Sequence, residues 1–331
     1  IKSLREKVSS KSLIFVIEKN ADIISTFMQT QDFSQIAGRN IMFLFGTDEE
    51  IITGFNDKIF SIDVISLFGN LTNVILPSYH SIYKNWISLI QDRIMDTIRH
   101  AFFMLGNDME DTIIGIQNNL ENIDEVLKSP SIRNFKDSYT DIPLFIISAG
   151  PSLDNNVKEL KNAWGKSLII ATDAVLSTLK KHEITPDGVV SIERVIMLYE
   201  KFYKGKELDP ETVFIGPPVV RSEVFATLKN NKKLVCLKEG ERINEWLNDI
   251  VGDERTLLMG TSCAHIAFSF GRYIGANPIV FVGQDLAYTK DGVTHSGDVE
   301  VKKKVDTKED KNIDYVKDYI GNLLPTSRAF K

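Results

Sequence analysis

Two short turns of the sequence bring glycine, proline and hydroxyl side chains to points where a strand is predicted to run into a helix. One turn reads Gly150-Pro151-Ser152 and the other reads Thr261-Ser262. Glycine permits close backbone approach, and the free amides in the first turn of a helix attract anions. We therefore predict that both turns bind a phosphate group, although many strand-to-helix turns of this composition bind nothing.

Two carboxylates follow the next predicted strands. Asp173 either caps the helix that follows it or accepts hydrogen bonds from a ribose hydroxyl or a base amine. Glu193 either contacts the substrate or forms a surface ion pair with Arg194 or Lys204. The sequence leaves both pairs of alternatives open.

The last strand of this series is followed by polar residues that would enter the same cleft. Gln284 and Asp285 come directly after it, and His295 lies ten residues beyond Asp285 in a loop flanked by glycines. Histidine titrates near neutral pH, so His295 is a candidate general base, and the alternative is an inert loop histidine. None of the other histidines has a partner at metal-ligand spacing, so we interpret them as structural. They are His80, His100, His182 and His265.

Several common nucleotide and metal motifs are missing from the sequence. It contains neither G-x-x-x-x-G-K-[ST] nor G-x-G-x-x-G, which excludes the usual ATP, GTP and dinucleotide loops. It also lacks D-x-D, so a metal-bridged diphosphate is not indicated and no metal site is predicted. The two cysteines, Cys236 and Cys263, lie in apolar surroundings and are interpreted as buried reduced thiols.

The segment 141–297 contains the elements that must position these residues. Short runs rich in Ile, Val, Leu and Phe alternate there with helix-compatible stretches, at 142–148, 167–172, 188–192, 213–215, 233–237, 256–259 and 278–282. Such runs are typical of strands buried on both faces, and their alternation with helices predicts a mostly parallel, doubly wound, Rossmann-like α/β sheet. In that fold, ligands bind beyond the carboxyl ends of the strands.

Two further parts precede the sheet. Residues 1–78 alternate apolar runs with polar stretches and predict a small N-terminal α/β domain. Residues 79–139 carry two stripes of apolar side chains at helical spacing and predict a helical connector. The second stripe consists of Met109, Ile113, Ile116, Leu120, Ile123 and Leu127. We thus expect a third, catalytic domain over residues 140–331.

Composition narrows the class of protein. A chain of 331 residues with 43% hydrophobic and 25% charged residues is typical of a globular protein of about two domains. Its formal net charge of −6 argues against a nucleic-acid partner, since phosphate backbones are bound mainly by clustered Lys and Arg. No apolar run is long enough for a membrane span, and we expect a cytoplasmic location. The start at Ile1 and the end at Lys331 suggest a fragment truncated at its C-terminal side.

The segments around these turns resemble the motility accessory factor (Maf) family of bacterial flagellin glycosyltransferases, which is grouped with the MptE-like, or 6-hydroxymethylpterin diphosphokinase-like, proteins. The resemblance rests on residues 147–154, 171–174, 260–262, 282–288 and 292–295 in that order. It spans about residues 141 to 297, and the preceding helical run is similar to the Maf layout as well.

The resemblance implies a domain related to bacterial sialyltransferases that use a CMP-sugar donor. On that pattern Gly150, Pro151, Ser152, Thr261 and Ser262 would surround the cytidine monophosphate, Asp173 would bind its nucleoside part, and Gln284 and Asp285 would line the donor cleft. His295 is the counterpart of the family's catalytic base, and Glu193 is a second catalytic candidate. Family members transfer a nonulosonic acid, of the pseudaminic or legionaminic type, from a CMP-activated donor to Ser or Thr of flagellin, as flagellar assembly and motility require.

Two other functions remain open at this point. A pterin diphosphokinase would need ATP, Mg²⁺ and converging carboxylates, for which Asp173, Glu193 and Asp285 are the candidates. A flagellin-binding module with a vestigial nucleotide cleft would need none of these residues. The glycosyltransferase expected here needs no obligatory cofactor beyond its CMP-sugar substrate, and its partner is flagellin.

Overall fold

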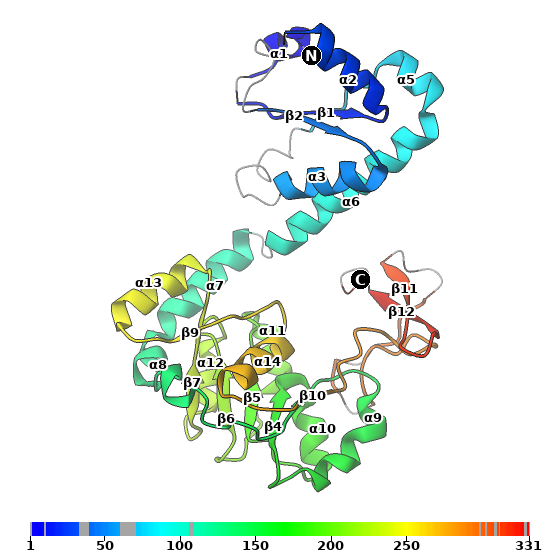
Figure 1. The fold of residues 1–331 in the computed structure, drawn as a ribbon. Coiled ribbons are helices and arrows are strands. Elements are labelled where there is room, and N and C mark those ends of the chain that lie inside the picture. The colour runs from blue at the N-terminus through cyan, green and yellow to red at the C-terminus, as the bar shows by residue number, and fades with distance from the viewer. Residues whose placement is uncertain are drawn as a thin grey trace. The chain divides into compact units, whose positions relative to one another are not determined.

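The computed structural model describes residues 2–9, 11–32, 40–59, 71–105, 109–297, 299–301, 303–307, 310, 312–327 and 330. It divides into two compact units, Ile1–Asp108 and Met109–Lys331, which are described separately (Figure 1). The three-part division into 1–78, 79–139 and 140–331 stays a prediction. Among the described residues, no helix has both the length and the apolar character needed to cross a bilayer.

The first unit is built on a short parallel pair of strands, β1 (Ile14–Glu18) and β2 (Ile41–Phe45). Its helices are α1 (Lys2–Lys7), α2 (Ala21–Thr30), α3 (Asp48–Ile59), α5 (Pro77–Ile82) and α6 (Lys84–Leu105). The core of the unit contains Ile51 and Phe55 from α3 and Ile90 and Ile98 from α6. The first apolar stripe of the sequence therefore forms a buried helical face, as predicted.

The second unit contains a six-stranded sheet in which every neighbouring pair is parallel. The strands are β3 (Leu144–Ile147), β4 (Leu168–Thr172), β5 (Gly188–Val190), β6 (Val213–Gly216), β7 (Lys233–Val235) and β10 (Ile279–Val282). Their order is β10-β3-β4-β5-β6-β7, so the chain proceeds one way from β3 to β7 and then returns to place β10 on the other side of β3. This confirms the predicted doubly wound α/β fold.

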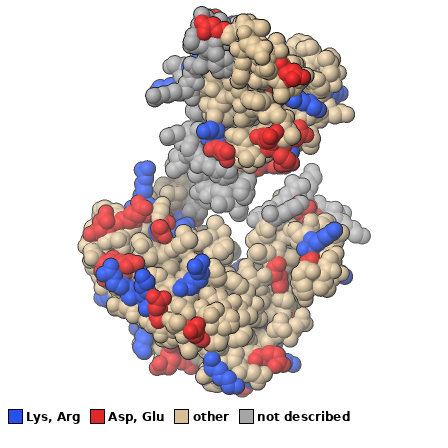
Figure 2. Space-filling model, viewed as in Figure 1, with Lys and Arg blue, Asp and Glu red and all other residues tan. Residues whose placement is uncertain are grey.

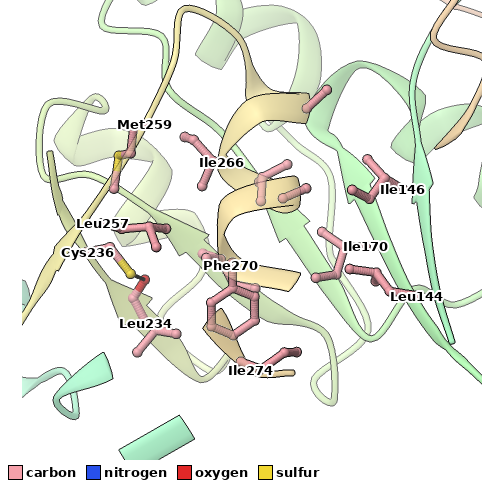
Figure 3. Close-up of a cluster of buried hydrophobic side chains, with 14 of the residues drawn as sticks. Leu144, Ile146, Ile170, Leu234, Cys236, Leu257, Met259, Ile266, Phe270 and Ile274 are labelled. Carbon is pink, nitrogen blue, oxygen red and sulfur yellow. Dashed lines mark hydrogen bonds between the residues drawn. The ribbon is translucent and has the colours of Figure 1, made fainter. Parts of the chain in front are cut away.

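Helices cover both faces of this sheet. Along each strand, successive side chains point to opposite faces. Ile146 and Ile170 face α14 (Cys263–Tyr273), where they pack with Ile266 and Phe270 in the cluster shown in Figure 3. Ile147 and its neighbours face the opposite side, which is covered by α9 (Leu153–Asn156), η4 (Val157–Asn162), η5 (Asp173–Val175) and α10 (Leu176–Lys181). Burial on both faces explains why the strands are continuous apolar runs in the sequence.

The remaining elements surround the sheet. They are α7 (Met109–Glu121), α8 (Ile123–Lys128), η3 (Ile132–Phe135), α11 (Ile196–Phe202), α12 (Ser222–Thr227), α13 (Arg242–Val251) and two small strand pairs. One pair is parallel, β8 (Leu237–Lys238) with β9 (Thr256–Leu257), and the other is antiparallel, β11 (Ile313–Lys317) with β12 (Leu323–Ser327). Acidic and basic side chains are interspersed on the face of the second unit shown in Figure 2.

Helix α7 carries the second apolar stripe on an exposed face, since Ile113 is 50% exposed and Leu120 is 46% exposed. The buried side of the helix carries Asn118 and Asn119 instead. The Asn118 amide donates to the carbonyl of Val219 at 2.8 Å, and the amide of Asn122, just beyond the helix, donates to that of Val220 at 2.7 Å. The stretch that follows β6 is thus hydrogen-bonded to asparagines of α7 and of the start of α8.

Candidate functional site

The carboxyl edge of the sheet has its switch point between β3 and β10, because the strand order reverses there. The turn after β3, Gly150-Pro151-Ser152, is called the β3 turn below. It lies against the residues that follow β10, since the amide of Ser148 donates to the carbonyl of Val282 at 2.8 Å and that of Gly150 to Gly283 at 2.7 Å. The structure thus brings together two of the predicted site segments.

Asp285 accepts the hydrogen bonds that Ser152 of the β3 turn donates. The backbone N–H of Ser152 donates to Asp285 Oδ2 at 2.7 Å, and the Ser152 hydroxyl donates to Asp285 Oδ1 at 2.5 Å. The turn therefore holds an anion, but that anion is a carboxylate of the chain itself. Pro151 and Gln284 are half-buried beside this pair. A phosphate that used the same two donors would have to displace Asp285.

Glycine is required at two positions of this junction. A Cβ on Gly150 would lie 2.5 Å from both the Gly283 carbonyl and Asp285 Oδ2. Gly283 has a φ of +71°, and its Cβ would lie 2.2 Å from the carbonyl of Ser148. Both contacts are closer than any side chain tolerates, so the two turns can interlock only as glycines.

The second predicted turn lies at the N-terminus of α14 and is called the α14 start, comprising Thr261, Ser262 and Cys263. Ser262 is the N-cap residue, but its side chain makes no capping hydrogen bond, and its hydroxyl lies 3.1 Å from His265 Nδ1 instead. Thr261 is exposed. Among the described residues, no side-chain oxygen accepts from the first-turn amides of this helix, so its positive end is open to a ligand.

Asp173 is buried beneath the α14 start. Its Oδ2 accepts from the Ser191 hydroxyl at 2.6 Å, and its Oδ1 accepts from the backbone of Ala174 at 2.8 Å and lies 4.0 Å from Cys263 Sγ. Burial raises the pKa of Asp173 from 3.8 to about 6, and the two hydrogen bonds oppose that rise. A carboxyl whose pKa is shifted toward neutral pH in this way is common at functional sites. The Tyr203 hydroxyl is buried nearby, and the negative charge of Asp173 adds to the burial that raises its pKa.

Glu193 lies at the rim of the same edge. Its side chain is exposed, but loss of hydration raises its pKa, and the positive charge of Arg194 opposes that rise. Arg194 forms an ion pair with Asp111 at 3.6 Å, and Lys204 forms one with Glu200 at 3.5 Å. Both proposed surface partners of Glu193 therefore form ion pairs with other carboxylates.

The loop that carries His295 is fixed to the segment that follows β3. The amide of Ser296 donates to the carbonyl of Ala149 at 2.9 Å, and the amide of Gly297 donates to both oxygens of Asp154, at 3.0 and 2.9 Å. His295 is half-buried, and burial together with the positive charge of Lys303 lowers its pKa. The histidine is therefore held beside the β3 turn in its neutral form at neutral pH.

Sequence reasoning missed the residues that support this site. Asp154 was visible within the motif that follows β3, and Ser191 comes directly after β5, but neither position by itself indicates a hydrogen-bond partner. Asp173, Glu193 and Asp285 do not form a metal-binding cluster, because the described residues contain no group of three His, Cys, Asp or Glu side chains placed to hold a metal ion.

Comparisons with known proteins agree with this fold. Residues 117–291 match the family model described as 6-hydroxymethylpterin diphosphokinase MptE-like. A solved structure described as the MAf glycosyltransferase from Magnetospirillum magneticum AMB-1 superposes with a TM-score of 0.59 at 15% sequence identity, over 96% of this chain and 48% of that one. The chain thus spans about half the length of that relative. A search of curated proteins found no match.

Proposed function

Because the chain belongs to the MptE-like family, whose model covers residues 117–291, we propose that it is a glycosyltransferase that carries a nonulosonic acid from a CMP-activated donor to Ser or Thr of flagellin. The sugar would be of the pseudaminic or legionaminic type, and the reaction, needed for flagellar assembly and motility, would take place in the cytoplasm. The observation that carries this proposal is the fold shared with a Maf glycosyltransferase over 96% of the chain.

The α14 start is the best candidate for the donor phosphate. The His265 amide donates to the carbonyl of Ser262 at 3.0 Å, but no side-chain cap is made at this helix start, which carries the hydroxyls of Thr261 and Ser262. Fixed dipoles of this kind stabilise the negative charge that develops on a leaving phosphate, and they need no reorganisation during the reaction. The β3 turn, whose donors already hold Asp285, would form the adjoining wall of the cleft with Gln284.

Asp173 would bind the nucleoside part of the donor. Its carboxylate accepts only two short hydrogen bonds, from Ser191 and Ala174, so lone pairs remain for a ribose hydroxyl or a base amine. Glu193 and His295 would act on the sugar side, with His295 as the base that accepts the proton of the flagellin hydroxyl.

Calorimetry with cytidine monophosphate tests the nucleotide site. We expect CMP to bind and Ser262→Ala to weaken it, whereas Ser269→Ala, on the same helix but away from its first turn, should leave the affinity unchanged. CMP that does not bind, or that binds equally well to Ser262→Ala, would contradict the α14 site. Mass spectrometry of flagellin incubated with the chain and a CMP-nonulosonic acid tests the transfer itself.

The family description favours pterin diphosphokinase as a second candidate. That reaction transfers a diphosphate from ATP and depends on Mg²⁺ bound near the phosphates. Binding of ATP with Mg²⁺ and a hydroxymethylpterin, in a chain that does not bind CMP, would favour it. A flagellin-binding module is tested by the same variant, because Asp173→Asn would then leave flagellin binding unchanged and no transfer would be seen with either chain.

A further inference from the structure

The hydroxyl of Thr294 has a defined set of hydrogen bonds. It donates to the carbonyl of Lys303 at 3.1 Å and accepts from the amide of Lys303 at 2.9 Å, and the Thr294 amide donates to the same carbonyl at 3.0 Å. Next to it, Val293 forms an antiparallel bridge with Lys304. The hydroxyl is thus locked to the backbone of the neighbouring segment.

This arrangement determines what the hydroxyl offers to His295. The Nδ1 atom of His295 lies 2.8 Å from Thr294 Oγ1. A hydroxyl has one hydrogen and two lone pairs, and one lone pair receives the Lys303 amide. The hydrogen has two acceptors within reach, the Lys303 carbonyl at 3.1 Å and His295 Nδ1 at 2.8 Å. When it is directed to Lys303, a lone pair remains for the ring, and His295 Nδ1 then carries the proton and donates it.

The other ring nitrogen is then the basic one. A neutral imidazole protonated on Nδ1 carries its lone pair on Nε2. Among the described residues, Nε2 has no hydrogen-bond partner. Among the described residues, the charged groups around the loop include Lys303, Lys304, which pairs with Asp291 at 3.4 Å, and Asp154. The backbone bonds of Ser296 and Gly297 hold the loop to the segment that follows β3.

We propose that Thr294 is a positioning residue that fixes His295 in the Nδ1-protonated tautomer and thereby makes Nε2 the base of the transfer reaction. This inference rests on the proposed glycosyltransferase function. In the step, the proton of the flagellin hydroxyl passes to Nε2 and its oxygen bonds to the anomeric carbon. The bond from that carbon to the phosphate oxygen breaks, and CMP leaves with the electron pair.

Nitrogen NMR of the histidine rings in the full chain reads the tautomer without any substrate. In the neutral ring of His295 we expect a protonated Nδ1 and an unprotonated Nε2, and His295→Gln identifies its signals by removing them. Thr294→Val keeps the shape of the side chain but removes the hydroxyl, so the ring should change to a mixture of tautomers. Thr294→Ser keeps the hydroxyl and should restore the wild-type spectrum.

The same variants are compared in the transfer assay. Thr294→Val should lower kcat by about 10-fold with the KM for the donor unchanged, a smaller loss than the roughly 100-fold or more that removal of a general base costs. Thr294→Ser should recover most of kcat. As a control, His80→Gln in the first unit should leave transfer unchanged.

Two results would overturn the inference: a neutral His295 protonated on Nε2 in the wild-type chain, or a folded Thr294→Val variant with unchanged tautomer and unchanged kcat. Failure of the broader proposal is distinguishable from these. A wild-type chain with the expected tautomer that transfers no sugar would refute the glycosyltransferase and leave the role of Thr294 in setting the tautomer intact.

Discussion

The β3 turn and the α14 start have similar sequences but different structures. Both follow a strand, both begin a helix and both present hydroxyl side chains at the carboxyl edge of the same unit. At the β3 turn, the amide and hydroxyl of Ser152 are bonded to Asp285. At the α14 start, Ser262 makes no side-chain cap and its hydroxyl contacts His265.

The difference shows that a phosphate-binding pattern has two possible uses. A helix start attracts an anion by its amides and its dipole. That anion is either a ligand or a carboxylate from the same chain. At the β3 turn this attraction links the segments that follow β3 and β10, whereas at the α14 start it remains available for a ligand. Five substitutions follow, beginning with Gly150→Ala and its matched variant Gly260→Ala, and they are arranged by the expected change in the free energy of unfolding.

Gly150→Ala should have the largest effect. Its Cβ would lie 2.5 Å from a backbone carbonyl that cannot move without separating β3 from β10, so we expect a loss of about 3 kcal/mol, as for severe overpacking. Gly260→Ala is the matched variant at the other turn. Its Cβ would meet the His265 ring at 2.6 Å and His265 Cβ at 2.9 Å, so rotation of the ring relieves only part of the overlap. We expect a smaller loss, of about 1–2 kcal/mol, because the nearest atoms belong to a side chain. Denaturant unfolding measures both, and equal losses would remove the contrast.

Asp173→Asn should stabilise the protein at alkaline pH. The folded-state pKa of about 6 lies above the ordinary 3.8, so the folded state favours the protonated carboxyl. The stability that this provides is fully present below pH 3.8 and is lost as the pH rises through about 6. Asparagine resembles the protonated form, so unfolding at pH 8 should cost about 2 kcal/mol more in the variant. No gain at pH 8 over that at pH 4 would show that Asp173 is not destabilised by its charge.

Asp285→Asn tests whether the carboxylate excludes phosphate from the β3 turn. Replacing a charged acceptor by a neutral one should weaken the bonds from Ser152 and cost about 1 kcal/mol of stability. Calorimetry of the same variant gives the sharper result. Unchanged CMP affinity would mean that the phosphate binds only at the α14 start, whereas tighter binding would mean that both turns contact it and would end the contrast.

Ser262→Ala should change stability least. Loss of a capping side chain typically costs about 1 kcal/mol, but Ser262 makes no capping bond, so we expect a change of less than about 0.5 kcal/mol. The thermal midpoint should therefore remain close to that of the wild type while CMP binding weakens. A large loss of stability would identify the α14 start as a structural junction like the β3 turn.

The sequence was sufficient to predict the sheet, because strands buried on both faces leave continuous apolar runs. It also placed the edge residues, since parallel strands bring their carboxyl ends together, and the resemblance to the MptE-like family is confirmed by residues 117–291. The bond between Ser152 and Asp285 could not be predicted. The two residues are 133 positions apart, and residue types alone do not distinguish a carboxylate that binds the protein from one that binds a ligand.

Helix α7 shows the opposite limitation. Its apolar stripe lies on an exposed face, whereas Asn118 and, just beyond the helix, Asn122 donate hydrogen bonds to the carbonyls of Val219 and Val220. A buried carbonyl without a donor costs more than an exposed isoleucine, so the asparagines face inward. Periodicity weighs apolar area alone and carries no information about unsatisfied carbonyls in a distant segment.

The position of β10 has a consequence for synthesis of the chain. β3 is the first strand of the sheet to emerge from the ribosome, yet one of its two neighbours is β10, which emerges last. At about 5–20 residues per second, one edge of β3 stays unpaired for roughly ten seconds. During that interval the edge is a template for pairing with other nascent chains. This edge of β3 therefore has to be protected until β10 pairs with it and Gly283 packs against Ser148.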